Sequence, residues 1–86
     1  MSLSEPVELV RRLGTAPPVG AIVLAEQAVD LYIAGYTRLD DRSIALDILL
    51  RDLARLRVLQ PDLDGFIADV EGYIDLLHRQ LTRQAA

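Results

Sequence analysis

Residues 61–83 read PDLDGFIADVEGYIDLLHRQLTR, and a regular apolar repeat runs through them. The large apolar residues recur at alternating intervals of four and three positions, which is the period of a helix that packs one side against another helix. The pattern therefore predicts a small helical protein of the all-α class. The positions that form this seam are Leu63, Ile67, Val70, Ile74, Leu77 and Leu81.

The chain combines a short length with a high apolar content. It has 86 residues, of which 51% are hydrophobic. A chain of this length buries only about 60% of the surface that its unfolded form exposes. We therefore expect one domain over residues 1–86, and we expect the remaining apolar surface to be covered by further copies of the chain. The expected oligomer is a homodimer or a tetramer.

Charge and cysteine content limit the classes of function. Thirteen acidic residues against nine arginines give a net charge of −4, and the chain contains no lysine and no cysteine. An acidic chain is poorly suited to the phosphate backbone, so we expect no nucleic-acid partner. Without cysteine there is no disulfide framework and no thiolate metal site. The N-terminal residues lack the pattern of a signal peptide, and arginine without lysine favours a GC-rich genome, so we expect a cytoplasmic, bacterial protein.

Breaks in the apolar pattern divide the chain into four predicted helices joined by short connections. Gly14 is expected to stop the first helix in a left-handed conformation, and Pro17-Pro18 and Gln60-Pro61 interrupt the chain further along. Short connections favour antiparallel packing of neighbouring helices. We therefore expect a small antiparallel bundle, with a short helix at 5–13 and long helices at about 18–36, 41–59 and 61–83.

The segment 18–36 is apolar on nearly every side. Such a helix either lies at the centre of a helical assembly or crosses a membrane. Glu26, Gln27 and Asp30 stand in the middle of this segment, and burying two carboxylates in lipid is costly. We therefore expect no membrane partner, and we expect the segment to form the central helix of an oligomer.

A second seam, made of leucines, runs through the segment 41–59 at intervals of three and four positions. Ile44, Ile48 and Leu59 are expected to widen this seam. Because apolar seams can pair between chains, we predict that copies of the protein associate through them. The predicted self-association residues are Val29, Ile33, Leu49, Leu53, Leu56, Ile67, Val70, Ile74 and Leu77.

The side of the segment 61–83 opposite its seam carries small residues. Gly65 and Gly72 are seven positions apart on that side, although a glycine within a helix costs about 1 kcal/mol relative to alanine. A strip of small side chains lets a second helix approach closely. We therefore predict a partner face formed by Gly65, Ala68, Gly72, Tyr73 and Leu76.

A few residues suggest other functions. Glu26 and Asp30 share a helix face at a spacing of four, and His78 is the single histidine. These three could form a carboxylate–histidine metal site or the centre of a small helical enzyme. A second alternative is an acidic inhibitor that mimics nucleic acid. Its acidic residues would be Asp40, Asp41, Asp62, Asp64 and Asp69.

An interaction protein is favoured over both alternatives. The sequence contains no glycine-rich phosphate loop and no Gly-x-Ser-x-Gly motif, and apolar seams account for much of its length. We expect a protein–protein interaction module without catalytic activity or cofactor, acting as a small oligomeric adaptor or regulatory subunit. Its expected partners are its own copies and another protein.

Overall fold

A computed structural model describes residues 4–85 and confirms the all-α class. Within this range four α-helices and one short 3₁₀ turn follow one another, and no strand occurs. Residues 1–3, considered above for a signal peptide, and residue 86 lie outside the described range. The elements are α1 (Glu5–Thr15), α2 (Ala21–Ala34), α3 (Leu39–Leu59), the 3₁₀ turn η1 (Pro61–Leu63) and α4 (Asp64–Ala85).

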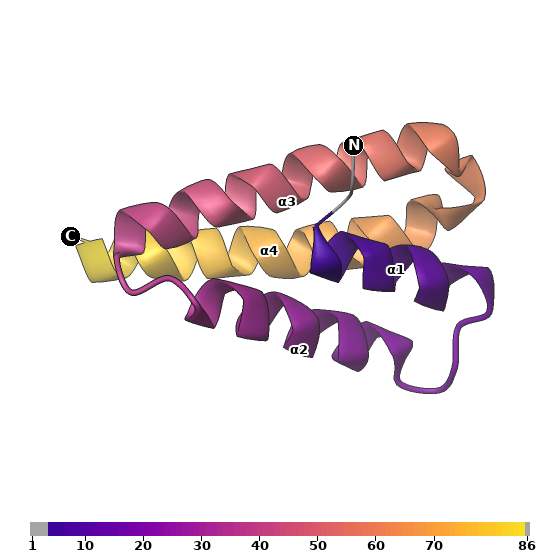
Figure 1. Cartoon of the computed structure of the whole chain (residues 1–86), viewed down its shortest axis with the longest axis horizontal. Coiled ribbons are helices and arrows are strands. Elements are labelled where there is room, and N and C mark those ends of the chain that lie inside the picture. Colours follow the sequence, from indigo (N-terminus) through magenta and orange to yellow (C-terminus); the bar gives the residue numbers. More distant parts are fainter. Residues whose placement is uncertain (1–3, 86) are drawn as a thin grey trace.

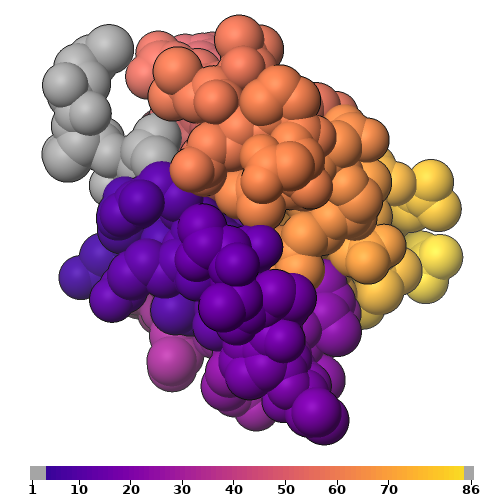
Figure 2. Space-filling view, turned by 90° about the vertical axis from the view of Figure 1, so that its right-hand side faces the viewer, coloured from indigo at the N-terminus to yellow at the C-terminus, as the bar shows by residue number. Residues whose placement is uncertain are grey.

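Successive helices run in opposite directions along the long axis of the molecule (Figure 1). The helices α1 and α4 lie between α2 and α3, so that α2 and α3 stand on opposite sides of the molecule. The connection between α1 and α2 and the connection between α3 and α4 lie at the same end, where Figure 2 shows the first, in violet, below the second, in orange. Each of α2 and α3 therefore has an outer side that faces away from the other helix.

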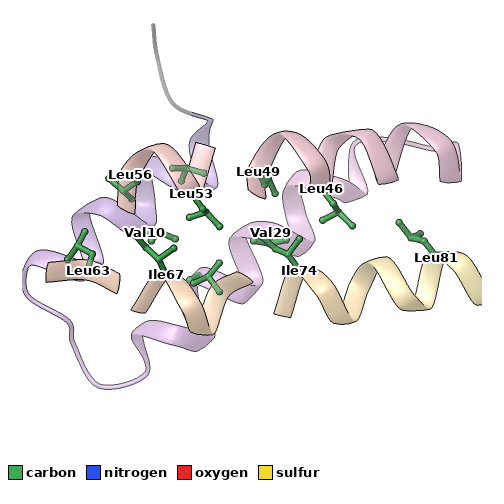
Figure 3. Packing of buried hydrophobic residues seen from close by; sticks show 13 residues of the cluster. Val10, Val29, Leu46, Leu49, Leu53, Leu56, Leu63, Ile67, Ile74 and Leu81 are labelled. Carbon is green, nitrogen blue, oxygen red and sulfur yellow. The ribbon is translucent and has the colours of Figure 1, made fainter. Parts of the chain in front are cut away.

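The core is apolar and draws on every helix (Figure 3). The seam of residues 61–83 faces inward as predicted, except that Leu77 is only partly buried, and the leucine seam of α3 packs against it. No polar or charged residue within residues 4–85 is buried. The buried cluster consists of Val7, Val10, Ala25, Val29, Leu46, Leu49, Leu53, Leu56, Leu63, Ile67, Val70, Ile74 and Leu81.

Two glycines shape the connection between α1 and α2, in a way that differs from the prediction. Helix α1 continues through Gly14 to Thr15, so Gly14 is not the left-handed stop of this helix. Gly20 has the left-handed conformation instead, with a φ of 82°, and α2 begins only after it. Gly14 allows α1 and η1 to lie close together, because a Cβ built at Gly14 would lie 2.7 Å from Cδ2 of Leu63. The missing side chain lets the end of α1 approach η1.

Proline delays the start of α4. Pro61 has no N–H group and follows Gln60, whose carbonyl accepts a hydrogen bond from the amide of Leu63 at 3.0 Å. This contact closes the 3₁₀ turn η1. The predicted helix 61–83 therefore begins as an α-helix at Asp64, and it extends to Ala85.

Polar side chains join α3 to α4 at two places. Nε of Arg57 lies 2.7 Å from Oδ1 of Asp64, and the same guanidinium also pairs with Glu71. Further along the two helices, Nε2 of His78 lies 3.1 Å from Oδ1 of Asp47. These pairs are partly exposed, so each contributes at most about 1 kcal/mol, and the apolar core remains the main source of stability.

Candidate interaction surfaces

Helix α2 fully buries only small or medium side chains and leaves several larger ones, including two leucines, exposed to solvent. Ala21, Ala25 and Val29 are its buried residues. Leu31 is 77% exposed and Leu24 is 45% exposed. The small inward residues let the neighbouring helices approach α2 closely, as dense packing requires. In the single chain α2 is therefore an outer helix, and the expected central position would need a further chain to cover it.

The exposed side of α2 is mostly apolar, with Gln27 within it and the charged Asp30 at its edge beside Val23. Leu24, Gln27, Leu31 and Ala34 follow the intervals of three, four and three positions that define a helix-packing seam. Val23 lies beside this seam and is 50% exposed. We call this surface the α2 face; it consists of Val23, Leu24, Gln27, Leu31 and Ala34, all of which are exposed.

An open groove runs beside the α2 face, between α1 and α2. Its cavity volume is about 360 Å³, which is near the lower end of the range of ligand pockets in proteins. Leu31 belongs both to the α2 face and to the wall of the groove, so the two surfaces are continuous. The groove is lined by Glu5, Pro6, Glu8, Leu9, Arg12, Ala28, Leu31 and Tyr32.

Ile44 and Ile48 lie on the outer side of α3. They are 57% and 41% exposed, and Leu59 at the end of the helix is exposed as well. The prediction that these three residues widen the inner seam is wrong. Leu46, which faces the core, is two positions from each isoleucine, and two positions turn an α-helix by about 200°. The isoleucines therefore point away from the core.

Opposite charges flank the two isoleucines on this side of α3. Asp41 stands three positions before Ile44, and Arg51 stands three positions after Ile48. Within residues 4–85 neither Asp41 nor Arg51 forms an ion pair, whereas Nη1 of Arg55 lies 3.8 Å from Oδ1 of Asp52. We call this surface the α3 face; it consists of Asp41, Ile44, Ile48, Arg51, Arg55 and Val58, all exposed.

The residues predicted for self-association lie in or against the core of a single chain. Ile33 and Leu77 are partly buried and pack against the core. The other seven are buried, so a contact between copies through them would require the core to open. In the structure these residues pack within one chain, so a contact between copies would have to use other surfaces. The seven are Val29, Leu49, Leu53, Leu56, Ile67, Val70 and Ile74.

The partner face predicted on α4 is exposed at four of its five positions. Gly65, Ala68, Gly72 and Leu76 face solvent, and a Cβ built on either glycine would meet no atom within 4 Å. Tyr73 is partly buried, and its hydroxyl donates a hydrogen bond to a carboxylate of α2. Tyr73 therefore belongs to the contact between α2 and α4.

Two tyrosines have raised pKa values. Burial raises the pKa of Tyr73 to about 12, and the hydrogen bond to Asp30 and the nearby charge of Glu26 add to this effect. A hydrogen bond with Tyr36 raises the pKa of Tyr32 to about 12, and burial adds to it. The Tyr32 and Tyr36 ring centroids are 5.8 Å apart, in an edge-to-face arrangement.

The structure does not assemble the metal site considered from the sequence. Asp30 accepts the hydrogen bond of Tyr73, while His78 lies beside Asp47 of α3. Within residues 4–85 no three histidine, aspartate or glutamate side chains are placed to hold a metal ion together. Asp30 and His78 thus have different partners, and the structure does not bring them together with Glu26 in one metal site.

The acidic residues of the inhibitor alternative are divided between the two ends of α3. Asp40 and Asp41 lie in the first turn of α3, whereas Asp62 and Asp64 follow its far end (Figure 1). Asp64 also pairs with Arg57. These residues do not form one continuous acidic surface of the kind that mimicry of nucleic acid requires.

Among residues 4–85, none of the helices combines the length and the apolar content that a membrane crossing demands. No protein-family model, curated protein or solved structure matches the chain. The α2 face and the α3 face are therefore the features on which a function can be argued.

Proposed function

We propose that the chain is a protein–protein interaction module, a small homo-oligomeric helical adaptor or regulatory subunit without catalytic activity. The observation that carries this proposal is the orientation of α2. The most apolar helix of the chain directs Leu24 and Leu31 to solvent and buries mainly alanines. A contiguous apolar surface rimmed by polar residues is typical of a docking site.

The α2 face is suited to an apolar helix of another protein. Fully burying a valine or leucine side chain contributes about 1.5–3 kcal/mol relative to leaving it exposed. Val23, Leu24 and Leu31 offer three such side chains, while the one exposed charge on this side of α2, Asp30, lies at the edge beside Val23. A helix laid along α2 would meet Leu24 and Leu31 at the seam spacing, and the groove beside Leu31 would receive its side chains.

Docking of this kind would complete an antiparallel bundle. In the single chain the inner side of α2 packs against α1 and α4, and its outer side has no cover. A docked helix would make α2 the surrounded helix that its composition favours. The proposal therefore explains why α2, the most apolar helix of the chain, leaves large apolar side chains exposed in the single chain.

The experiment compares Leu31→Gln with Leu76→Gln, the same change at exposed positions of α2 and α4. Both variants are expected to unfold within about 0.5 kcal/mol of the wild type, since neither side chain is buried. Each tagged variant is produced in the cells that make the natural protein, and its complexes are crosslinked and weighed by native mass spectrometry. We expect Leu31→Gln to lose a bound protein that the wild type and Leu76→Gln retain. The reverse pattern would place docking on α4 and contradict the proposal.

A further inference from the structure

The α3 face is complementary in charge to itself. Its acidic end carries Asp41, its basic end carries Arg51, and Ile44 and Ile48 lie between them. We infer that α3 pairs antiparallel with α3 of a second copy, so that the chain is a homodimer with its two α2 faces turned outward. This inference rests on the proposed function only in requiring that the chain associates with itself.

The spacing on the α3 face sets the register of this pairing. Suppose that two antiparallel α3 helices cross at position 46. A residue that precedes position 46 in one copy then faces the residue that follows position 46 by the same number of positions in the other copy. Ile44 then meets Ile48 of the second copy, and Asp41 meets Arg51. Each contact occurs twice because the dimer has two-fold symmetry. This register therefore matches apolar with apolar and carboxylate with guanidinium.

Other arrangements of the same two helices are less favourable. A parallel pair would place Asp41 against Asp41 and Arg51 against Arg51, and like charges in contact oppose association. An antiparallel pair shifted along the helix so that Ile48 faces Arg51 would set an apolar side chain against a charged one. The charges thus favour the antiparallel orientation, while the isoleucines supply the buried apolar surface.

The groups that this pairing uses are available in the single chain. Asp41 and Arg51 are exposed and form no ion pair within residues 4–85, so pairing between copies breaks no existing contact. Asp41 lies in the first turn of α3, where the helix dipole favours its negative charge. Both charges would lie at the rim of the contact, where they remain partly hydrated and cost little to bring together.

The position of α3 leaves the α2 face free in such a dimer. The two helices stand on opposite sides of the molecule, with α1 and α4 between them (Figure 1). Pairing through α3 would therefore direct the two α2 faces away from each other. A dimer of this shape could hold two copies of a docked helix, and a partner that carries two such helices would bind more tightly to it than to a single chain.

The test exploits the reciprocity of the predicted contact between Asp41 and Arg51. Solution masses are measured by light scattering over a dilution series for the wild type, Asp41→Arg, Arg51→Asp and an equimolar mixture of the two variants. Each variant alone brings like charges together twice, and we expect its dimerisation to weaken at least about tenfold. The mixture is expected to dimerise again, because a mixed dimer opposes arginine at position 41 with aspartate at position 51 and keeps the natural pair on the other side.

A control variant makes the same change from aspartate to arginine at the start of another element. Asp62→Arg in η1 is away from the α3 face and is expected to dimerise like the wild type. If circular dichroism shows that Asp41→Arg disturbs α3, then Asp41→Asn, which removes only the charge, is expected to weaken dimerisation in the same direction. Variants that dimerise like the wild type, or a mixture no stronger than its components, would overturn the inference.

The same measurements separate this inference from the docking role of α2. Leu31→Gln is expected to leave the dimer intact. If Leu31→Gln is monomeric while the α3 variants still dimerise, copies meet through α2 and the inference is wrong. A wild type that stays monomeric at every concentration also overturns the inference, while loss of a bound protein by Leu31→Gln would still support the docking role of the α2 face.

Discussion

The hydroxyl of Tyr73 on α4 donates a hydrogen bond to the carboxylate of Asp30 on α2, across 43 positions of sequence. This contact helps to fix the rotation of α2 about its own axis. With Asp30 held beside α4, Val29 faces the core and Leu31 faces solvent. The direction of the α2 face thus depends on a polar contact as well as on the size of the inward side chains.

The first prediction concerns the titration of Tyr73. Because its pKa is raised to about 12, the absorbance of tyrosinate in the wild type should still be rising near pH 12. Tyr73→Phe should remove part of that late rise, which an ultraviolet titration measures directly. A Tyr73 that ionises fully near pH 10, the ordinary value for tyrosine, would show that the contact with Asp30 does not form in solution.

The same shift predicts how stability depends on alkaline pH. The folded chain holds the phenol proton of Tyr73 more tightly than the unfolded chain does, so this group stabilises the fold fully below about pH 10. Its contribution is lost as the pH rises through about 12. Urea unfolding at a series of pH values should show a shallower alkaline decline for Tyr73→Phe than for the wild type. Equal slopes would contradict this assignment.

Two glycine substitutions should have opposite effects. Gly72→Ala is expected to stabilise the fold by up to about 1 kcal/mol, because position 72 is an open position on the helix surface. Gly14→Ala gains the same helical preference but forces a methyl group against the buried Leu63, and overpacking of this kind costs about 1–3 kcal/mol. Urea unfolding of the pair measures the difference. A more stable Gly14→Ala would show that the contact between α1 and η1 is looser than the structure has it.

A matched pair of leucine truncations tests which seam forms the core. Leu53→Ala should lower the free energy of unfolding by about 2–5 kcal/mol, since Leu53 is buried in the core. Leu31→Ala should change it by no more than about 0.5 kcal/mol, since Leu31 faces solvent. Thermal and urea unfolding at a concentration where the chain is monomeric compare the two. Similar losses in the free energy of unfolding would mean that α2 turns Leu31 toward the core, unlike in the structure.

Ile48→Ser tests the apolar part of the α3 face without changing any charge. It should weaken dimerisation about tenfold or more while leaving the stability of the monomer nearly unchanged, because Ile48 is exposed in the single chain. Leu59→Ser is the matched control, since Leu59 is also exposed but lies beyond the residues that pair. Sedimentation equilibrium of both variants gives the comparison. Equal dimerisation of the two variants would argue against pairing through α3.

The sequence predicted the helices better than it predicted their outer surfaces. The seam from Leu63 to Leu81 and the break at Pro61 were visible because core-facing residues and proline leave strong local patterns. The inward side of α2 was not visible, because a helix that is apolar on every side has no periodic signal. Close packing selected Ala25 and Val29 for the inside, and that selection depends on the shapes of α1 and α4.

The α3 face was missed for a different reason. Ile44 and Ile48 lie close in sequence to the leucines of the inner seam, so their apolar character alone predicts that they widen it. The spacing of three and four positions that links Asp41, Ile44, Ile48 and Arg51 was nevertheless present in the sequence, on the side opposite Leu46. Comparing both sides of each helix for such spacing would have found it.

Whether this chain is a self-associating interaction module is decided by the mass of the wild type in solution, measured by light scattering over a dilution series. We predict a mass that rises with concentration toward twice the 9.5 kDa of one chain, as a dimer paired through α3 requires. A mass of 9.5 kDa at every concentration would contradict it.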